Sequence, residues 1–382
     1  MKKTVFDPSD FTRVLSDWFL ANQRDLPWRD AENARDAYRV LVSEVMLQQT
    51  TVAAVVPFYK KFLARFPNAN TLAAASIEEV LPLWEGLGYY RRARLLHACA
   101  QAIVEKHGGV FPREYSEVLA LPGVGKYTAG AVSSIAHELP QPIVDANVMR
   151  VFARLFLIES DVKSSAAQTQ FWERATQIVE AAHAQNISPA VINPALMELG
   201  ALICTPKKPK CERCAVQSFC GAFACNRQDE LPQIAPRRAP TPMHDVCIFA
   251  RDLSTQDEKV LLRQRSHDAD IWWRGMWELP RTTRRENEDN ETALRRLLRD
   301  ELHLKETQIG VMVKRIKHGV TIYAIELQCY EVEIEASAAP IENARWFSWP
   351  EIEALALPTS MRTLVNWLHK HRSAQAAQPA LF

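Results

Sequence analysis

Two acidic residues, Glu44 and Asp145, lie in apolar stretches of sequence where a carboxyl group can do proton chemistry. Val40, Leu41 and Val45 flank Glu44, and burial among apolar side chains raises the pKa of a carboxyl group, so that it can act as an acid. Asp145 stands between an apolar segment and the start of a predicted helix. Hydrolysis through an oxocarbenium-like state requires one protonated and one ionised carboxyl group. The two residues are therefore a candidate catalytic pair, with surface exposure or helix capping as the alternative.

A compact group of cysteines suggests a metal site. Cys204, Cys211, Cys214 and Cys220 are separated by six, two and five residues, and Cys225 follows as a spare that could replace Cys220. Zinc sites favour two C-x-x-C pairs, and this loop has one, whereas an irregular loop with four thiolates suits a [4Fe–4S] cluster. We predict such a cluster on the first four cysteines; buried cysteines without a ligand are the alternative.

The segment "LPGVGKYTAG" (121–130) predicts a tight turn between two helices. Gly123 and Gly125 allow unusual backbone angles, and helix formers follow Lys126. The glycine spacing does not match a P-loop or a dinucleotide fingerprint, and no predicted strand precedes it. The pattern instead predicts a helix-hairpin-helix, whose exposed N–H groups bind a DNA phosphate without recognising sequence. An ordinary helix–helix turn is the alternative.

Helices must position these groups, because residues 1–225 have apolar side chains at helical spacing. The clearest predicted helices are 38–49, 52–66, 77–84 and 92–106, with breaks at Pro67-Asn68, Gly86-Leu87-Gly88 and Gly108-Gly109. A linker rich in proline and arginine is predicted for 226–243. Alternating and β-branched residues then predict strands, with one helix at 291–302, in an α+β domain over 244–370. A flexible tail is predicted for 371–382.

The charge of the chain does not reveal its partner. Lys and Arg (46) nearly balance Asp and Glu (45), and a basic face for a nucleic acid could be offset elsewhere on the surface. The N-terminal residues lack the apolar run of a secretory signal, and no stretch approaches the ~18 apolar residues of a membrane span. We expect a cytoplasmic protein without a membrane partner.

Several motifs together resemble one family. "SEVMLQQT", "WEGLGYYRRAR", "LPGVGKYTAGAV", "IVDANVMRV", "MELGALIC" and the cysteine spacing are similar to those of the adenine DNA glycosylases, the MutY-type enzymes of the helix-hairpin-helix superfamily. The resemblance is dense over residues 10–225. It implies an all-helical helix-hairpin-helix glycosylase core with an iron–sulfur cluster loop (204–220), followed by a NUDIX-like α+β C-terminal domain. We expect a bacterial enzyme that associates with the nucleoid. We also expect a monomer, since one chain suffices for one lesion.

The resemblance implies that the enzyme removes adenine mispaired with 8-oxoguanine or guanine in double-stranded DNA, as a step of base excision repair. Glu44 would protonate the flipped adenine, Asp145 would stabilise the sugar cation, and Asn147 would place the catalytic water or Glu44. Trp28 and Arg29 match the edge of the adenine pocket, unless they only form a buried helix start. The residues that match the positions contacting DNA and the oxidised guanine are Gln49, Thr50, Leu87 and Tyr89.

Tyr127 separates this chain from relatives that also cleave the strand. Bifunctional relatives, similar to endonuclease III, have their Schiff-base lysine at the position of Tyr127, whereas Lys126 lies one residue away and points ~100° around the helix. We therefore expect Lys126 to contact a phosphate, and the Tyr127 hydroxyl to lie near Glu44 or Asp145 in a monofunctional enzyme. The alternatives are a bifunctional glycosylase/lyase and a non-catalytic iron–sulfur DNA-binding module.

Some positions depart from the family pattern. Pro194 stands where the family often has a Gln or Glu that contacts adenine, and Glu198, one helical turn later, need not substitute for it. In the NUDIX motif, residues 296–304 are RLLRDELHL, in which leucine replaces one metal-binding carboxylate, so pyrophosphatase activity is not expected. The family's Phe-Ser-His element for 8-oxoguanine is Ile316-Lys317-His318 here, with the histidine retained. The last five residues, Gln378–Phe382, resemble the Q-x-x-L-F peptide that docks on the sliding clamp.

Overall fold

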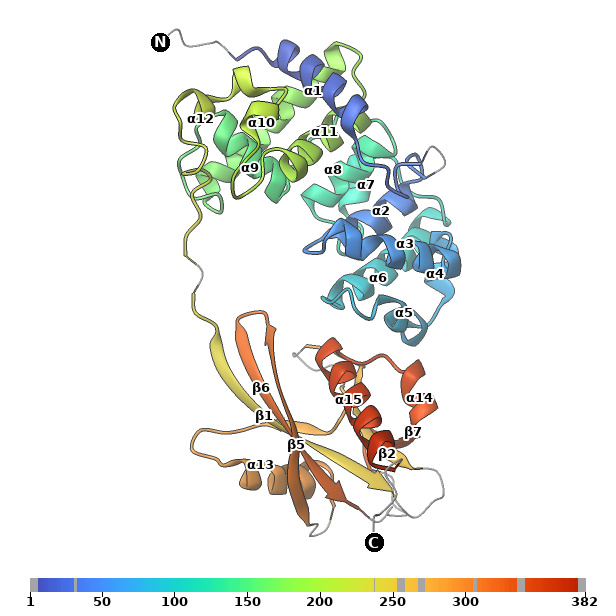
Figure 1. The fold of residues 1–382 in the computed structure, drawn as a ribbon. Coiled ribbons are helices and arrows are strands. Elements are labelled where there is room, and N and C mark those ends of the chain that lie inside the picture. Colours follow the sequence, from blue (N-terminus) through green and yellow to red (C-terminus); the bar gives the residue numbers. More distant parts are fainter. Residues whose placement is uncertain are drawn as a thin grey trace. The chain divides into compact units, whose positions relative to one another are not determined.

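The computed structural model of the chain describes residues 6–30, 33–236, 238–252, 258–266, 272–304, 308–334 and 341–376, without the side chains of 373–376. The expected clamp peptide, Gln378–Phe382, lies outside the described residues. Contacts divide the chain into two compact units (Figure 1). The first comprises 1–76 and 92–236 and is helical; the second comprises 77–91 and 237–382 and is built on a sheet. Among the described residues, no helix is long and apolar enough to cross a membrane.

The first unit is an assembly of helices joined by short turns. The α-helices are α1 Pro8–Asn22, α2 Ala37–Leu47, α3 Val52–Arg65, α4 Ala69–Ala74, α6 Arg91–His107, α7 Tyr115–Leu119, α8 Lys126–Ile135, α9 Ala146–Leu155, α10 Ser165–Ala184, α11 Pro189–Leu202 and α12 Gly221–Ala224. The short 3-10 helices η1 (Cys211–Arg213) and η2 (Gln217–Phe219) lie in the cysteine loop. The helices predicted at 38–49, 52–66 and 92–106 are confirmed as α2, α3 and α6.

Polar caps and one apolar core fix the helices that carry the predicted site. Asp36 caps α2 and Asp145 caps α9, each by accepting a backbone N–H at the helix start. The apolar faces of α1, α9, α10 and α11 bury a shared core that includes Phe152 and Phe171. The cysteine loop is anchored to the same core, against which three of its thiols pack: Cys204, Cys214 and Cys220.

The second unit contains α5 (Ile77–Trp84) and a mixed sheet. Its strands are β1 Thr241–Asp252, β2 Lys259–Gln264, β3 Trp277–Glu278, β4 Arg281–Thr283, β5 Ile309–Val320, β6 Tyr323–Glu333 and β7 Ala344–Ser348. The order is β3-β2-β1-β6-β5, while β4 pairs with β1 and β7 pairs with β2. The β1–β6 pair is parallel and the other pairs are antiparallel.

Helices cover both faces of this sheet (Figure 1). Successive side chains of a strand point to opposite faces, so β1 contributes to two cores. Val246 and Ile248 pack with helix α13 (Asn290–Arg296), whereas Cys247 and Phe249 pack with helix α15 (Thr359–Ala376). A short helix, α14 (Trp349–Ala354), precedes α15.

The helix predicted at 291–302 is confirmed, but the prediction that it is the only helix among the strands of this unit is wrong. Helix α13 ends at Arg296 and continues as a π-helical turn, Leu297–Glu301, and α14 and α15 are further helices. α15 extends to Ala376, into the segment expected to be a tail, and β1 begins at Thr241, inside the expected linker. A mostly polar composition concealed α15, because its stability depends on a narrow apolar stripe that packs on the sheet: Met361, Leu364, Val365 and Leu368.

Candidate active site

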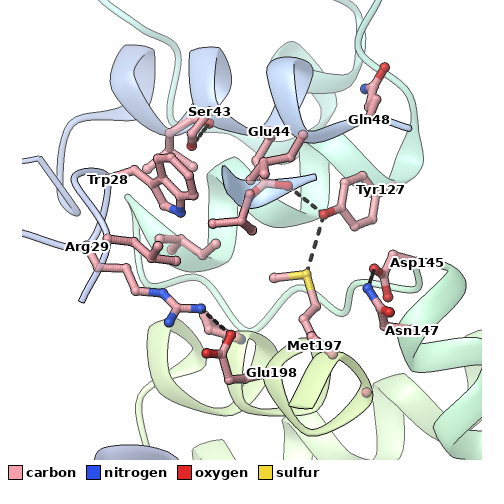
Figure 2. A pocket seen from close by; sticks show the side chains of 18 of the residues that line it. Trp28, Arg29, Ser43, Glu44, Gln48, Tyr127, Asp145, Asn147, Met197 and Glu198 are labelled. Atoms are coloured by element: carbon pink, nitrogen blue, oxygen red, sulfur yellow. Dashed lines mark hydrogen bonds and ion pairs between the residues drawn. The ribbon is translucent and has the colours of Figure 1, made fainter. Parts of the chain in front are cut away.

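A cavity of about 1240 Å³ in the first unit is lined by residues of α2, α8, α9 and α11 (Figure 2). It is larger than the ~300–1,000 Å³ typical of small-molecule sites, so it has room for an extruded nucleotide. Most of the predicted site residues meet there although they are far apart in sequence. Those that line the cavity are Trp28, Arg29, Glu44, Gln49, Thr50, Gly123, Gly125, Lys126, Tyr127, Asp145 and Asn147.

Glu44 is buried on α2 at the cavity wall, with 5% of its surface exposed. Its Oε2 accepts a 2.5 Å hydrogen bond from the hydroxyl of Tyr127 on α8, which also contacts the sulfur of Met197 at 3.4 Å (Figure 2). Burial raises the pKa of Glu44 to about 7; the Tyr127 bond opposes this rise and the negative charge of Asp145 adds to it. Near neutral pH, a large share of Glu44 is therefore protonated and able to donate its proton.

Asp145 is the N-cap of α9, so the capping role considered for it is present in the structure. Its Oδ1 accepts from the backbone N–H of Val148 at 2.7 Å, and its Oδ2 accepts from Nδ2 of Asn147 at 2.7 Å. Burial raises the pKa of Asp145, and these two bonds partly offset the rise. Capping does not withdraw the carboxylate from the cavity, because Asp145 also lines it. One side chain can therefore start a helix and face a substrate.

Arg150, a buried residue of α9, connects this part of the cavity to the cysteine loop. Its Nη2 donates to Oδ1 of Asn147 at 2.9 Å and to the carbonyl of Gly200 at 2.7 Å, and its Nε donates to the carbonyl of Cys204 at 2.6 Å. Gly200 permits this close packing, since a Cβ there would lie 2.6 Å from the Cβ of Asn147. The orientation of Asn147, and through it of Asp145, thus depends on α11 and on the start of the cysteine loop.

A second buried carboxylate, Glu198 on α11, lies across the cavity and has different partners (Figure 2). Arg24 binds it through Nε at 2.6 Å and Nη2 at 2.8 Å, and Arg29 binds it through Nη2 at 2.9 Å. Burial alone would raise its pKa, but the hydrogen bonds and charges of the two arginines lower the pKa of Glu198 to about 2. Glu198 is therefore an ionised anchor for Arg29 and not a proton donor.

Trp28 and Pro194 complete the wall around Arg29. Trp28 is buried, and its ring packs edge-on against Tyr59 with centroids 5.4 Å apart. Pro194 is buried within α11 and lines the cavity, but it has no N–H group or side-chain amide to offer a base. Among these three residues, the Arg29 guanidinium and the indole N–H of Trp28 are the hydrogen-bond donors of this wall.

The helix-hairpin-helix turn joins α7 to α8. Gly123 has φ of +74°, and a Cβ there would lie 2.6 Å from the Cβ of Leu95, so the position requires glycine. Gly125 is the N-cap of α8 and makes no side-chain cap, which leaves the first N–H groups of the helix available for an anion. The Lys126 ammonium lies 3.9 Å from the ring centroid of Trp172. The phosphate contact expected of Lys126 stays a prediction.

Arg92, a buried residue of α6, holds the turn that carries Gln49 and Thr50. Its Nη1 donates to three carbonyls at the end of α2, at 2.5 to 2.9 Å, and its Nη2 donates to Oγ1 of Thr50 at 3.3 Å. Gln49 is exposed and has φ of +56°, which is uncommon for a residue other than glycine. One arginine therefore fixes both the end of the helix that carries Glu44 and the turn predicted to contact DNA.

The remaining predicted contact residues belong to the second unit. Leu87 is 6% exposed, whereas Tyr89 is 55% exposed. His318 lies on β5, with the ring of Trp273 6.1 Å away, and both of its ring nitrogens are buried without a hydrogen-bond partner in the described part of the chain. Burial, followed by the positive charge of Arg281, lowers the pKa of His318 to about 4. The imidazole is therefore neutral at physiological pH.

The four predicted cluster ligands share one loop, and their surroundings fit an iron–sulfur cluster. Burial raises the pKa of the Cys214 thiol to about 12, and the charges of the other three cysteines add to the rise. Arg154, which is 2% exposed, donates from Nη1 to Sγ of Cys204 at 3.3 Å. Buried thiolates that lie close together need a cationic partner. In a four-iron cluster, each iron binds one of the four cysteine thiolates. Among the described residues, no three His, Cys, Asp or Glu side chains form a site for a single metal ion.

Comparisons with known proteins match each of these regions. Residues 42–177 match the HhH-GPD superfamily of base excision DNA repair proteins, residues 204–220 the iron–sulfur binding domain of endonuclease III, and residues 253–367 the NUDIX domain. The adenine DNA glycosylase of Rattus norvegicus is 34% identical over 96% of this chain and 80% of the relative. The chain belongs to the adenine DNA glycosylase family. The Homo sapiens adenine DNA glycosylase is 33% identical over 94% of this chain and 74% of the relative.

As an adenine DNA glycosylase, the chain is a hydrolase of N-glycosyl bonds that acts on DNA in base excision repair. Its helical glycosylase domain is followed by an iron–sulfur domain with the cysteine cluster at 204–220 and by a NUDIX-like domain with a mixed sheet. A solved thermostable thymine-DNA glycosylase is 29% identical, covers 57% of this chain and 97% of its own, and has a TM-score of 0.49.

Several residues that shape the site were not predicted from the sequence. Arg92 lies on an otherwise apolar face of α6, and a charge is rarely buried unless it is paired, so its position carried a usable signal. Arg150 shares its face of α9 with Asn147 and Arg154, so the sequence does not mark it as buried. Arg24 follows α1 in a polar segment and Met197 lies in an apolar helix, so neither stands out from its neighbours. Their roles depend on Glu198 and Tyr127, which only the fold brings close.

Proposed function

We propose that this adenine DNA glycosylase removes adenine paired with 8-oxoguanine, or with guanine, by acid-assisted hydrolysis in the cavity of the first unit. The observation that carries the proposal is the pair of carboxyl groups in that cavity, Glu44 with a pKa of about 7 and Asp145 at the start of α9. A stacked base cannot reach them, so the adenine must be extruded from the duplex. Extrusion costs about a few kcal/mol, and less when the base is mispaired.

Glu44 donates its proton to a ring nitrogen of the extruded adenine as the glycosidic bond breaks, so that the base leaves as a neutral molecule. The positive charge that develops on the sugar faces the Asp145 carboxylate, which Asn147 and the Val148 N–H hold in place. The Tyr127 hydroxyl bonds to Glu44 and lowers its pKa, which means that it stabilises the carboxylate left after proton transfer. Water then adds to the sugar carbon and gives its proton to the Glu44 carboxylate, which completes the hydrolysis and restores the acid.

The enzyme is monofunctional in this proposal. Strand cleavage through a Schiff base needs an amine at the sugar carbon. Tyr127 occupies the position of the Schiff-base lysine of bifunctional relatives, and its hydroxyl is engaged with Glu44. The neighbouring Lys126 ammonium lies over the ring of Trp172. Borohydride reduction should therefore trap little DNA on the protein, and efficient trapping through Lys126 would support the bifunctional alternative.

The second unit recognises the oxidised guanine in this proposal. Its candidate contact is His318, whose buried ring nitrogens have no hydrogen-bond partner in the described part of the chain. Ile316 and Lys317 replace the family's Phe and Ser, so the contact must differ in detail. Nucleotide hydrolysis is not favoured, because Glu301, a retained acidic residue of the NUDIX motif, is ion-paired by Arg263 at 2.8 Å and Arg296 at 3.5 Å.

The tail residues Gln378–Phe382 dock on a sliding clamp in this proposal, which rests on the Q-x-x-L-F pattern of the sequence. In this proposal the enzyme is a monomer. It acts on the genome of a bacterium while it is bound to the clamp. Deleting Leu381 and Phe382 should weaken clamp binding and leave adenine release unchanged. Equal clamp affinity with and without the two residues would contradict this role.

The Glu44→Gln variant tests the acid role. Glutamine keeps the size of the side chain but cannot donate an acidic proton, so release from an A·8-oxoguanine duplex under single-turnover conditions should fall by about 10²- to 10⁴-fold. Glu117→Gln, which changes an exposed glutamate on α7 of the same unit, is the matched control and should react at the wild-type rate. Adenine release by Glu44→Gln at the wild-type rate would contradict the mechanism.

A further inference from the structure

The segment 77–91 lies in the sequence between helices of the first unit, but it folds as part of the second. It consists of α5 and a turn over residues 85–90 that leads into α6. This turn carries Leu87 and Tyr89, which match the family's DNA-contacting positions. Its attachment to the C-terminal part of the chain therefore bears on how those two residues are presented.

Glu85 and Arg362 attach the turn to helix α15 by a two-point ion pair. The Arg362 guanidinium donates from Nε to Oε1 of Glu85 at 2.6 Å and from Nη2 to Oε2 at 3.1 Å, and both side chains are 17% exposed. The same guanidinium donates to the carbonyls of Ile352 at 2.9 Å and Leu355 at 2.5 Å. Arg362 is therefore fixed by the backbone around α14 while it binds Glu85 bidentately, the most directional arrangement available to an arginine.

Tyr90 attaches the other end of the turn to the same place. Its hydroxyl donates to the carbonyl of Leu357 at 3.2 Å, and the N–H of Leu357 donates to Oε2 of Glu85 at 3.4 Å. Tyr90 is 6% exposed, so this contact is buried. The peptide groups of one residue, Leu357, thus bind both of the residues that bracket the turn.

Between the two attachments, the backbone adopts left-handed conformations. Gly86 has φ of +106° and Gly88 has φ of +72°, which glycine tolerates, but Tyr89 has φ of +49°. A tyrosine adopts such a conformation when its surroundings enforce it. The side chain of Tyr89 is 55% exposed, so the attached turn presents it at the surface of the unit.

We propose that the Glu85–Arg362 ion pair is a positioning device that sets Tyr89 for contact with the base opposite the adenine. This inference rests on the proposed function, in which the second unit recognises the base opposite the adenine. It also takes Tyr89 to contact that base, as its match to a family contact position implies. Glu85 and Arg362 are positioning residues that act through Tyr89 and touch no reacting atom. It follows that Tyr89 and His318 are presented by the same unit, so the opposite base is examined by one folded body.

The test measures how strongly each variant prefers 8-oxoguanine to guanine opposite adenine. Single-turnover rate constants, and Kd values for duplexes with a non-cleavable 2′-fluoro-2′-deoxyadenosine, give this preference for the wild type, Glu85→Ala, Tyr89→Ala and the double variant. A small misplacement of a contact group is costly, so Glu85→Ala should lower the preference about 10-fold. The double variant should be no worse than Tyr89→Ala, because coupled residues are not additive.

Glu291→Ala is the matched control, because it removes an exposed ion pair with Arg295 from the same unit and should keep the wild-type preference. A Glu85→Ala enzyme that keeps the wild-type preference, or a double variant whose loss is the sum of the two single losses, would overturn the inference. A wild-type enzyme with no preference for 8-oxoguanine would instead contradict the proposed function.

Two further variants decide the question if Glu85→Ala does not fold. Glu85→Gln keeps the size and loses the charge, and it should lose most of the preference. Arg362→Lys keeps the charge but cannot form the two-point contact, so it should lose part of the preference. Wild-type preference in both folded variants would overturn the inference.

Discussion

Two buried glutamates face the same cavity with pKa values shifted in opposite directions. Burial raises the pKa of Glu44 to about 7, whereas the pKa of Glu198 is about 2. Exposure does not distinguish them, since they are 5% and 1% exposed. Their hydrogen-bond partners distinguish them. Glu44 is bonded to a neutral tyrosine hydroxyl, which does not offset the rise in pKa that burial causes. Glu198 is bonded to two guanidinium groups, whose positive charges more than offset that rise. One side of the cavity is therefore suited to proton transfer, and the other is a structural anchor.

The largest effect expected after that of Glu44→Gln comes from separating the two roles of Asp145. Asparagine is as good an N-cap as aspartate, so Asp145→Asn should keep α9 and the free energy of unfolding within about 0.5 kcal/mol of the wild type. It removes the negative charge that we propose faces the sugar cation, and release should fall by about 10²- to 10³-fold. Single-turnover release and urea unfolding measure the two quantities. If Asp145→Asn is as stable as the wild type and releases adenine at the wild-type rate, Asp145 only caps the helix and has no catalytic role.

The next effect concerns the anchor. Glu198→Gln would leave two guanidinium groups without their counter-charge, and the free energy of unfolding should fall by about 2–3 kcal/mol, less than for wholly buried pairs because Arg24 is 34% exposed. Glu138→Gln, which breaks the exposed pair with Arg35, is the control and should cost less than about 1 kcal/mol. Equal losses for the two variants, in urea unfolding at neutral pH, would contradict the assignment.

The pH dependence of that loss has a definite sign. The folded-state pKa of Glu198 lies below its ordinary value of 4.5, so its ion pairs stabilise the fold above pH 4.5. That stabilisation disappears as the pH falls from 4.5 toward 2. The difference in unfolding free energy between the wild type and Glu198→Gln should shrink over this window. If this difference in unfolding free energy stays constant between pH 4.5 and 2, the charge of Glu198 does not stabilise the fold.

The smallest expected effect tests the Tyr127 bond. Tyr127→Phe removes the hydrogen bond that lowers the pKa of Glu44, so the pKa should rise above about 7 and the loss of activity on the alkaline side should move to higher pH. The rate at neutral pH should fall by less than about 10-fold, as expected for one hydrogen bond to a charged group. A pH profile that moves to lower pH, or does not move, would contradict this account of the bond.

The sequence was informative where a local pattern determines the structure. The helices 38–49, 52–66 and 92–106 follow from apolar periodicity, and the turn at Gly123 follows from glycine spacing. Glu44 was likewise predicted from its local sequence, because an acidic residue among apolar neighbours is unusual. Helix α15 was missed because its apolar stripe matters only against a sheet that is distant in sequence.

The partners of the site residues could not be predicted, because they are set by long-range packing. Glu198 stood out in the sequence only as a neighbour of Pro194, and its ion pairs with Arg24 and Arg29 span more than 160 residues. The link from Asp145 through Asn147 and Arg150 to the cysteine loop likewise joins α9 to α11. Nothing in the local sequence around residues 77–91 indicated that they fold with the C-terminal unit.

The central claim, that burial holds Glu44 protonated for proton transfer, is tested most directly by the pH dependence of single-turnover adenine release from an A·8-oxoguanine duplex. The account predicts a rate that declines on the alkaline side with a midpoint near the pKa of about 7 given for Glu44, and a further loss in acid as Asp145 becomes protonated. A wild-type rate that stays constant up to about pH 9 would contradict the claim, because Glu44 would then be ionised while release continued.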